Sequence, residues 1–574
     1  MPDSLPDAPP AGSTAATAQP AATEVYAIHG ADPEVLAYAM AKYSRSALTL
    51  RESLKEISAQ RAEQFLNTFY FQYGHRSIAD LAHVAFAVER LSLLAAIALV
   101  DEPRWDGQER STRYQDFRKS GYYTPPFADE SQRALYAETI AHLFDSYQAM
   151  GAGMLDELKQ HTPRPATMDE AAYTRTLRAR AFDMARYLLP LATNTSLGQI
   201  TNARTLEQQI ARLLGSDYGE VRDLGERLRD AASGVAWDPS GDARQVKVAP
   251  TLVKYTAPSY FAAQSKAALT EAARDLMGNA PIQSMPADLP NVELIATPPG
   301  ERLSLEIDLA TSLLYPHTHF RYAQLREVVC ALPEARILEL VALGTAHRGK
   351  HDDLPRAYAA ANGLRFDILM DVGGFRDMHR HRRCTQLLQD YTAAHGYDTP
   401  DFPGQPAVST SSVAGIFAEA IARADEGYGA LGGSPFGTIA QALDATSDPK
   451  LRAHSNAGVP VPQFQANGAL QMSWGKPLEP PPTLDARGAP GQTNRPVPPD
   501  AAYVLPLATR CRSLFTMDFA QAVYMSELRS TPAGHWSYRN VAWQMFQAVQ
   551  RQYPGLAQHF RTRDPHETVD LLQR

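Results

Sequence analysis

Hydrophobic positions divide the chain into two blocks. From about Glu24 to Leu228, apolar residues recur at three- and four-residue spacing, which predicts helices. Pro190 and Gly215 end the last two of these, because proline breaks a helix and glycine favours a helix end. The predicted helical stretches are residues 33–46, 54–74, 77–100, 133–159, 171–190 and 196–215.

The second block begins near Val292, after a Pro/Gly-rich bridge at 278–291, and its pattern is more mixed. Short apolar runs predict strands at 292–297 and 364–372, and helical spacing returns at 319–332, 414–431, 520–530 and 537–553. Residues 474–500 contain too much proline and glycine for regular structure and are expected to form an exposed loop.

Both blocks place a cluster of polar residues, a Leu-Pro pair and a helix in the same order. Leu189-Pro190 precedes a helix in the first block, and Leu505-Pro506 precedes one in the second. We interpret this order as an ancient duplication. The predicted organisation is a disordered tail at 1–24, a first domain at 25–250, a linker at 251–291 and a second domain at 292–574.

Composition restricts the class of protein. Of 574 residues, 44% are hydrophobic and 21% charged, which is typical of a soluble globular protein. A net charge of −8 argues against general nucleic-acid binding, so any phosphate recognition should be local. The three cysteines lie far apart and indicate neither a disulfide framework nor a metal site, which fits a reducing cytoplasm. Without a run of 18 apolar residues, no membrane span is expected.

The most unusual local feature is the basic run Arg380-His381-Arg382-Arg383, which closely follows the apolar stretch FDILM. These side chains repel one another where the chain is expected to turn inward. A polyanionic ligand would remove the conflict, because guanidinium groups bind phosphates in a bidentate manner and remain charged. The alternative is an ordinary solvated helix face.

Two polar stretches of the first block are further candidates. Ser77, in Gly-His-Arg-Ser, is expected to cap a helix whose N-terminus could attract an anion, and His83 is interpreted as a core histidine. Some 30 residues later, GQERSTRYQDF brings Glu109, Ser111 and Arg113 together. A hydroxyl beside a guanidinium favours a small phosphate cradle, and a plain polar turn is the alternative.

Together these segments resemble the flavin-dependent thymidylate synthase family. Its members carry Gly-His-x-Ser, then Arg-His-Arg, then seven residues and a serine that lies within Asn-Glu-x-Ser-x-Arg-Tyr. An Arg-x-x-Leu-Pro segment, an Asn-Ala-Arg segment and a late Leu-Arg follow. The first block matches without a gap from Gly74 to Tyr114, except that Asp101-Glu102-Pro103 replaces Arg-His-Arg. Arg186, before Leu188-Leu189-Pro190, matches the nucleotide-binding arginine. The flavin-binding segment is matched by Asn202, Ala203 and Arg204, with Gln208 at the place of a second Asn.

The second block keeps the motif that the first block lacks, and it lacks several that the first block keeps. Arg380-His381-Arg382 is intact, whereas Asp390 stands in place of the serine and Ala502 in place of the arginine before Leu-Pro. Arg529 falls on the arginine that the family uses to polarise the uracil ring, while the first block has Leu213 there. Since family members assemble each active site from several subunits, a duplicated chain could lose one set per half and keep composite sites.

The resemblance implies an α+β fold made of two tandem thymidylate-synthase-complementing-protein-like domains, each with helices packed on a small antiparallel sheet. It implies reductive methylation of dUMP to dTMP, with FAD as cofactor and NADPH and methylenetetrahydrofolate as co-substrates, in a homodimer that forms a pseudo-tetramer. It implies no metal and no nucleic acid. The implied catalytic residue is Arg529; the implied cofactor-binding residues are Ser77, Glu109, Asn202, Arg204, Gln208, Arg380, His381 and Arg382; the implied substrate-binding residues are Glu109, Ser111, Thr112, Arg113, Arg186, Arg380 and Arg529.

Two alternatives stay open at this point. The replaced motif at Asp101 and the missing second serine could give a flavoprotein with a changed nucleotide substrate. The chain could also be a catalytically silent paralogue that binds a nucleotide.

Overall fold

The structure is a computed structural model that describes most of the chain. The described residues are 30–42, 50–56, 76–113, 115–117, 120–237, 245–277, 291–298, 300–349, 352–432, 462–464, 470–472, 500–567 and 571–572. The predicted tail at 1–24, residues 57–74 of the second predicted helix and residues 474–499 of the Pro-rich loop lie outside these ranges.

The first half of the described chain is mainly helical with three short strands. Its helices are α1 (Pro33–Lys42), α2 (Leu50–Glu56), η2 (Arg76–Leu81), α4 (Leu93–Val100), α5 (Glu130–His161), α6 (Glu170–Ala185), η3 (Arg186–Leu188), α7 (Ala203–Leu214) and α8 (Gly219–Ser233), and its strands are β1 (His83–Ser92), β2 (Asp106–Glu109) and β3 (Asn194–Asn202).

The second half follows after α9 (Tyr260–Met277) and β4 (Val292–Leu294). Its remaining strands are β5 (Leu364–Asp371), β6 (Thr385–Leu388), β7 (Pro462–Phe464), β8 (Leu470–Met472) and β9 (Arg510–Met517). Its helices are α10 (Ser304–Leu314), η4 (Tyr315–His317), α11 (Tyr322–Cys330), α12 (Glu334–Leu343), η5 (Arg356–Ala359), α13 (Val372–Met378), η6 (Ala393–His395), η7 (Val408–Thr410), α14 (Ala414–Ala430), η8 (Asp500–Val504), α17 (Phe519–Arg529), α18 (Trp536–Gln552) and η9 (Pro554–His559).

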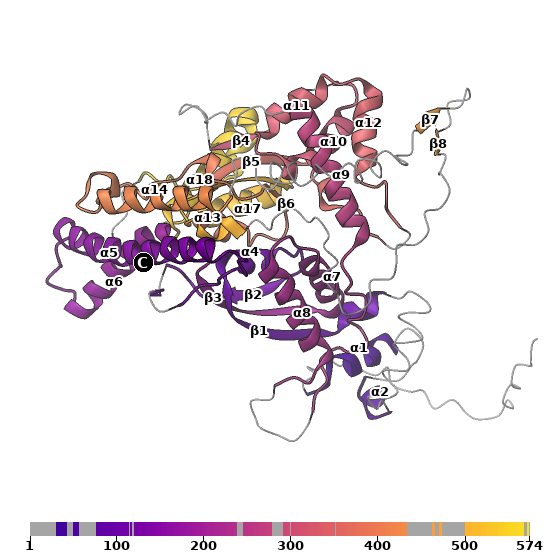
Figure 1. Cartoon of the computed structure of the whole chain (residues 1–574), viewed down its shortest axis with the longest axis horizontal. Coiled ribbons are helices and arrows are strands. Elements are labelled where there is room, and N and C mark those ends of the chain that lie inside the picture. Colours follow the sequence, from indigo (N-terminus) through magenta and orange to yellow (C-terminus); the bar gives the residue numbers. More distant parts are fainter. Residues whose placement is uncertain are drawn as a thin grey trace, which may run out of the picture.

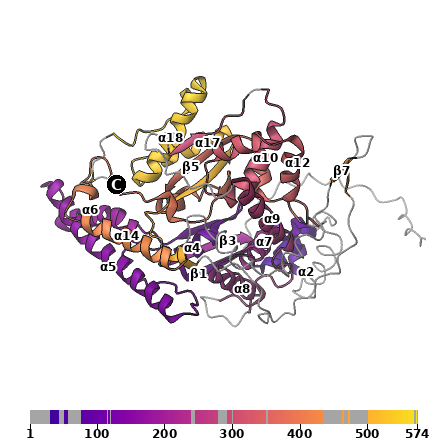
Figure 2. The ribbon, with the colours of Figure 1, turned by 45° about the horizontal axis from the view of Figure 1, so that its top comes forward.

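Each half builds its own antiparallel sheet. The first has the order β1-β3-β2 and the second the order β4-β5-β9-β6. Figure 1 shows the two sheets in separate layers with helices around them, and α5 of the first half lies along α14 of the second in both views (Figures 1 and 2). The predicted α+β class is therefore confirmed.

The two halves are joined by an exchange of main-chain hydrogen bonds between two identical Leu-Pro-Leu-Ala-Thr segments, residues 189–193 and 505–509. Leu191 donates to the Leu505 carbonyl at 2.9 Å, and Leu507 donates to the Leu189 carbonyl at 2.9 Å. Pro190 and Pro506 face each other across this bridge. A reciprocal exchange of this kind is the pattern that two-fold symmetry produces.

The same symmetry relates the start of α4 to the start of α13. Ser92 caps α4 by accepting from the Ala95 N–H, and Asp371 caps α13 by accepting from the Gly374 N–H. The next residues after these caps donate to the carbonyls of Thr193 and Thr509, at 2.9 Å in each case. By the same correspondence β1 matches β5, β2 matches β6, β3 matches β9 and α7 matches α17. The internal duplication expected from sequence is thus visible in the backbone.

The larger hydrophobic core runs through both halves. It includes Leu94, Leu189 and Leu206 from the first half with Phe375 and Leu505 from the second. A smaller core joins α9, α10, α11 and α12 beside the second sheet. The segment predicted as a linker, 251–291, thus contains the 18-residue helix α9, which packs on α10 and α12.

Two predicted helices are wrong in part. Residues 83–92 form strand β1 instead of continuing a helix, and 194–202 form strand β3 before α7 begins. These segments pair with each other along their whole length, so the hydrogen bonds of the sheet replace those of a helix. His83, interpreted as a core histidine, is exposed at the first position of β1.

The predicted strands at 292–297 and 364–372 and the predicted helices of the second block are confirmed as β4, β5, α11, α14, α17 and α18. Among the described residues, no helix is long and apolar enough to cross a membrane, and no three potential metal ligands cluster. All three cysteines are free thiols.

Candidate functional site

Helix α13 carries basic side chains from the second half into the first. Arg376 forms a buried ion pair with Glu109, the last residue of β2, and Arg380 lies 3.6 Å from the other Glu109 carboxylate oxygen. The side chains of Arg376 and Glu109 are 5% and 6% exposed. The carboxylate of one half therefore lies between two arginines of the other.

Arg113 is held by groups from both halves. Its Nε and Nη2 donate to the two carboxylate oxygens of Asp183 at 2.7 and 3.1 Å, and its Nη1 donates to the Tyr538 hydroxyl at 3.1 Å. Asp183 lies on α6 and Tyr538 on α18. The bidentate contact fixes the plane of the guanidinium group.

The environment of Asp183 shifts its pKa. Burial is the largest single effect and raises the pKa, but the charges of Arg113, His535 and Arg186 and the hydrogen bonds from Arg113 together lower it further, to about 2. Asp183 therefore stays ionised, and Arg113 keeps its counter-ion.

We expect Asp183→Asn to change the acid stability of the protein. Because the folded pKa is about 2 and the ordinary value is 3.8, ionised Asp183 stabilises the folded state above pH 4, and this contribution disappears as the pH falls towards 2. The substitution should lower the free energy of unfolding at pH 7 by about 2 kcal/mol and reduce its dependence on pH between 4 and 2. Urea unfolding of both proteins across this range measures it. An unchanged pH dependence would contradict the assignment.

Arg186 is a buried arginine with an incomplete set of partners. Its side chain is 2% exposed, and its Nη1 donates to the Thr112 hydroxyl at 3.3 Å and lies 3.9 Å from an Asp377 carboxylate oxygen. Its Nε and Nη2 have no hydrogen-bond partner within the described part of the chain, and neither do Nε of Arg376 and Nη2 of Arg382. Buried guanidinium nitrogens without acceptors are costly, and oxygens of an anionic ligand would satisfy them.

Arg529, at the end of α17, is oriented by two rings. Its Nε donates to Nε2 of His381 at 2.8 Å, and its guanidinium group lies 5.4 Å from the centre of the Tyr538 ring. Burial first, and then the charges of Arg529 and Arg382, lower the pKa of His381 to about 3. Neutral His381 can therefore accept this hydrogen bond.

The charges of this region do not balance. Among the described residues, six arginines lie in this region, and three carboxylates pair with them: Arg113, Arg186, Arg376, Arg380, Arg382 and Arg529 with Glu109, Asp183 and Asp377. Asp101 and Glu102, which pair with Arg356 and Arg212, also attract Arg382. The contacts of the six arginines and three carboxylates link them into one group, which we call the arginine cluster. A cationic excess in a largely buried place is the arrangement that binds phosphate or another anion.

Sequence reasoning found four of the six arginines through motifs and a fifth, Arg382, at the edge of the group. Arg382 lies 4.9 Å over the Trp105 ring of the first half. The sequence reasoning missed Arg376. This residue precedes Arg380 by about one helical turn, the spacing that places two side chains on one face. The sequence reasoning also missed Asp183 and Tyr538, for which only nearness to Arg186 and Arg529 was a signal.

The remaining predicted residues have other surroundings. The Ser111 hydroxyl accepts from the Arg113 N–H at 3.2 Å, so it shapes the loop that carries Arg113. Asn202 caps α7, Arg204 pairs with Asp80 at 3.4 Å, and Gln208 donates to Asp353 at 3.1 Å. These contacts of Asn202, Arg204 and Gln208 do not include the arginine cluster. Ser77 lies inside η2, which begins at Arg76, so it is not the cap of a longer helix.

The residues that replaced Arg-His-Arg in the first half have become structural. Asp101 pairs with Arg356 of the second half at 2.6 Å, and Glu102 pairs with Arg212 at 2.7 Å. These acids hold arginines of their own chain, so they no longer offer a binding site for an anion.

At the place related to the arginine cluster by the internal symmetry, several of the charged residues are replaced by apolar ones. Leu388 of β6 lies in the register position of Glu109, since Leu388 pairs with Ser513 as Glu109 pairs with Leu197. By the same correspondence, the residues equivalent to Arg376, Arg186 and Arg529 are Ile97, Ala502 and Leu213. The described residues thus contain one such arginine cluster per chain.

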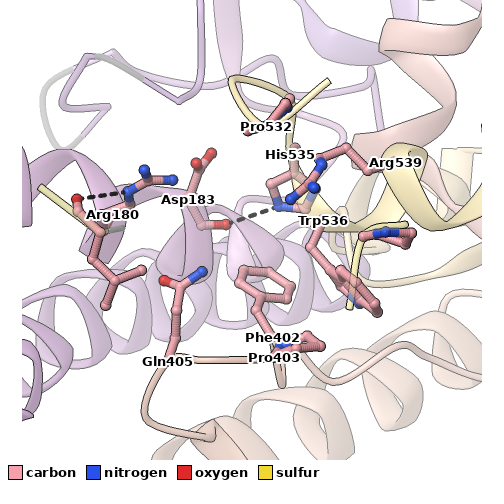
Figure 3. Close-up of a pocket in the computed structure, with 12 residues that line it drawn as sticks. Arg180, Asp183, Phe402, Pro403, Gln405, Pro532, His535, Trp536 and Arg539 are labelled. Carbon is pink, nitrogen blue, oxygen red and sulfur yellow. Dashed lines mark hydrogen bonds between the residues drawn. The ribbon is translucent and has the colours of Figure 1, made fainter. Parts of the chain in front are cut away.

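A shallow pocket lies behind the Asp183–Arg113 ion pair. Figure 3 shows Arg180 and Asp183 from α6 facing His535 and Arg539 from the second half, with Phe402 at one side. The free space inside the pocket is small, about 20 Å³, which is room for about one water molecule. Nε2 of His535 lies 3.4 Å from the Asp183 carbonyl oxygen, and its ring stacks on Tyr187. The pocket therefore borders the groups that position Arg113.

The chain thus has two antiparallel sheets, joined by reciprocal Leu-Pro segments, and an arginine cluster between its halves. The family model described as thymidylate synthase complementing protein matches residues 27–236 and 361–555. The chain belongs to this family, that of the flavin-dependent thymidylate synthases, and contains its domain twice.

Known relatives include double-length proteins. A protein named UPF0159 from Chlamydia muridarum is 26% identical over 569 residues, which cover 93% of this chain and 91% of the relative. A namesake from Thermoplasma acidophilum is 23% identical over 88% of this chain and 89% of the relative.

Single-length relatives match only part of the chain. The flavin-dependent thymidylate synthase of Clostridium tetani is 25% identical over 231 residues, 40% of this chain and 84% of the relative. A solved structure, the flavin-dependent thymidylate synthase ThyX of Helicobacter pylori complexed with FAD and dUMP, is 16% identical with a TM-score of 0.24 and covers 35% of this chain and 89% of that one.

Proposed function

We propose that the chain is an FAD-dependent thymidylate synthase that methylates dUMP reductively to dTMP, with methylenetetrahydrofolate as carbon donor and NADPH as reductant. The observation that carries the proposal is the arginine cluster, in which retained family residues of one half meet those of the other. Glu109, Arg113 and Arg186 come from the first half, and Arg380 and Arg529 from the second. We expect the cytoplasm as its location.

The proposed roles follow from the contacts of each group. Arg113 and Arg186 bind the nucleotide phosphate, because Asp183 fixes the first and the second has two unpaired nitrogens. Arg529 faces the pyrimidine and stabilises the negative charge that develops on the ring, held in place by neutral His381. Thr112 keeps Arg186 oriented through its hydroxyl.

The residues present fit an anionic cofactor at the second-half arginines. FAD carries a pyrophosphate, and the unpaired buried nitrogens of Arg376 and Arg382 are donors that such a group would satisfy. When bound, FAD supplies the redox chemistry, and the protein supplies binding and orientation. Arg380 and Arg382 would hold it, with Glu109 keeping Arg380 in place. For Asn202, Arg204 and Gln208 the flavin role stays a prediction.

The test is a flavin spectrum combined with an isotope assay. The purified protein should be yellow and should release tritium from 5-tritiated dUMP only when flavin, methylenetetrahydrofolate and NADPH are present. A flavin-bound protein that leaves dUMP unchanged would indicate a changed substrate. A colourless protein that binds dUMP would indicate a silent paralogue.

The number of sites per chain is a separate prediction. Because the symmetry-related place has Leu388, Ala502 and Leu213 instead of charged groups, we expect one dUMP bound per chain and not two. Isothermal titration calorimetry at known protein concentration measures the stoichiometry. Two equivalent sites per chain would contradict it. Titration of Leu388→Glu serves as a control, because this change alone should not create a second site.

A further inference from the structure

Tyr538 contacts an arginine of each half, Arg113 of the first and Arg529 of the second. It is the third residue of α18, whose N-terminus is fixed by the His535 side chain, an acceptor for the Ser537 N–H. The Ser537 hydroxyl in turn donates to Asp371, the cap of α13. Tyr538 is 5% exposed. Two helix starts thus determine where its ring lies.

The contacts of Tyr538 divide between its two ends. The hydroxyl accepts from Nη1 of Arg113 at 3.1 Å, and the guanidinium carbon of Arg113 lies 6.0 Å from the ring centre. The ring centre lies 5.4 Å from the guanidinium carbon of Arg529. The side chain therefore contacts a cation by hydrogen bonding at its polar end and a second cation through its π-face.

These contacts complete the support of both arginines. Asp183 occupies the Nε and Nη2 edge of Arg113, so the Tyr538 hydroxyl fixes the remaining Nη1. His381 accepts from Nε of Arg529, so the ring of Tyr538 limits how the guanidinium plane can turn. The ring of Tyr538 thus offers a favourable contact to both guanidinium groups.

A purely structural role would explain the burial of Tyr538 but not the direction of its hydroxyl. The oxygen of a buried tyrosine can accept from any N–H nearby, and one of the main chain would serve. Here the hydroxyl oxygen meets a charged donor that comes from the other half of the chain, 425 residues away.

We infer that Tyr538 is a positioning residue that sets Arg113 for the phosphate and Arg529 for the pyrimidine, and so couples the two halves of the substrate site. The inference rests on the proposed function and assigns this chain a site residue that its family motifs do not mark. Tyr538 is not a catalytic residue, because it acts through the two arginines.

The test separates the hydroxyl from the ring. Tyr538→Phe keeps the ring and removes the hydroxyl, so the Kd for dUMP should rise about 10-fold while kcat changes less than about threefold. Tyr538→Leu removes both, so kcat should also fall, by about 10-fold. Calorimetric titration gives Kd and tritium release gives kcat. Tyr260→Phe, at an exposed tyrosine of α9, should leave both unchanged.

The outcomes distinguish the inference from the proposed function. A folded Tyr538→Phe protein with the Kd and kcat of the wild type overturns the inference, and so does an equal loss in both parameters for the two variants. If the wild type neither binds dUMP nor releases tritium, the proposed function fails. The crystal structure of Tyr538→Phe then decides the inference: displaced Arg113 supports it, and an unmoved Arg113 overturns it.

Discussion

Arg376→Ala should destabilise the protein more than any other single change at the interface between the halves. The substitution leaves the Glu109 carboxylate buried with Arg380 at 3.6 Å as its remaining cation. Removing one partner of a buried ion pair costs about 3–5 kcal/mol, because the other charge loses both its counter-ion and its water. Chemical denaturation of the two proteins at pH 7 measures the difference.

The matched control for this prediction replaces both members of the pair. Arg376→Met combined with Glu109→Gln removes both charges at similar volume, so most of the lost stability should return. A loss below about 1 kcal/mol for Arg376→Ala would show that Glu109 does not depend on this partner. The double variant would then be no more stable than the single one.

Arg529→Ala should abolish most of the proposed activity while leaving the protein folded. Its guanidinium group is the cation that His381 and Tyr538 orient, so its loss removes charge stabilisation from the transition state. We expect kcat to fall by about 10²–10³-fold. Tritium release from 5-tritiated dUMP gives the rate, and thermal unfolding shows whether the fold is kept.

Two further variants test whether the loss of rate is specific to the Arg529 guanidinium group. Arg529→Lys keeps the charge but loses the Nε–H that His381 accepts, so its rate should lie between those of the wild type and the alanine variant. Arg383→Ala removes an exposed arginine of the same basic run that pairs with Asp518 at 3.1 Å, and its rate should equal that of the wild type. A fully active Arg529→Ala protein would contradict the role proposed for Arg529.

The sequence allowed the fold class and the helices with clear periodicity to be predicted, but not strands β1 and β3. Residues 83–92 contain two alanines, which also suit a helix, and their neighbours continue the helical spacing into α4. The pairing of β1 with β3, which lies about a hundred residues later, decided the outcome. The local spacing of hydrophobic residues does not reveal that a strand pairs with a segment so far away in the sequence.

The candidate site was predictable where short motifs marked it and not where distant partners supply it. Arg380, Arg113 and Arg529 stand in recognisable segments. Tyr538 does not, since a tyrosine in an amphipathic helix is typical of any core. Its significance depends on the position of Arg113, which the sequence alone does not place beside it.

The hydrogen bond from Arg113 to Tyr538 also has a consequence for folding during synthesis on the ribosome. The two residues are 425 positions apart. At about 5–20 residues per second, synthesis takes roughly 20–85 s to cover that distance. During this interval the first half has Arg113 and Arg186 in place without the helix that completes their setting. The nascent chain must therefore keep a partly finished, cationic surface in solution until almost its last residues emerge.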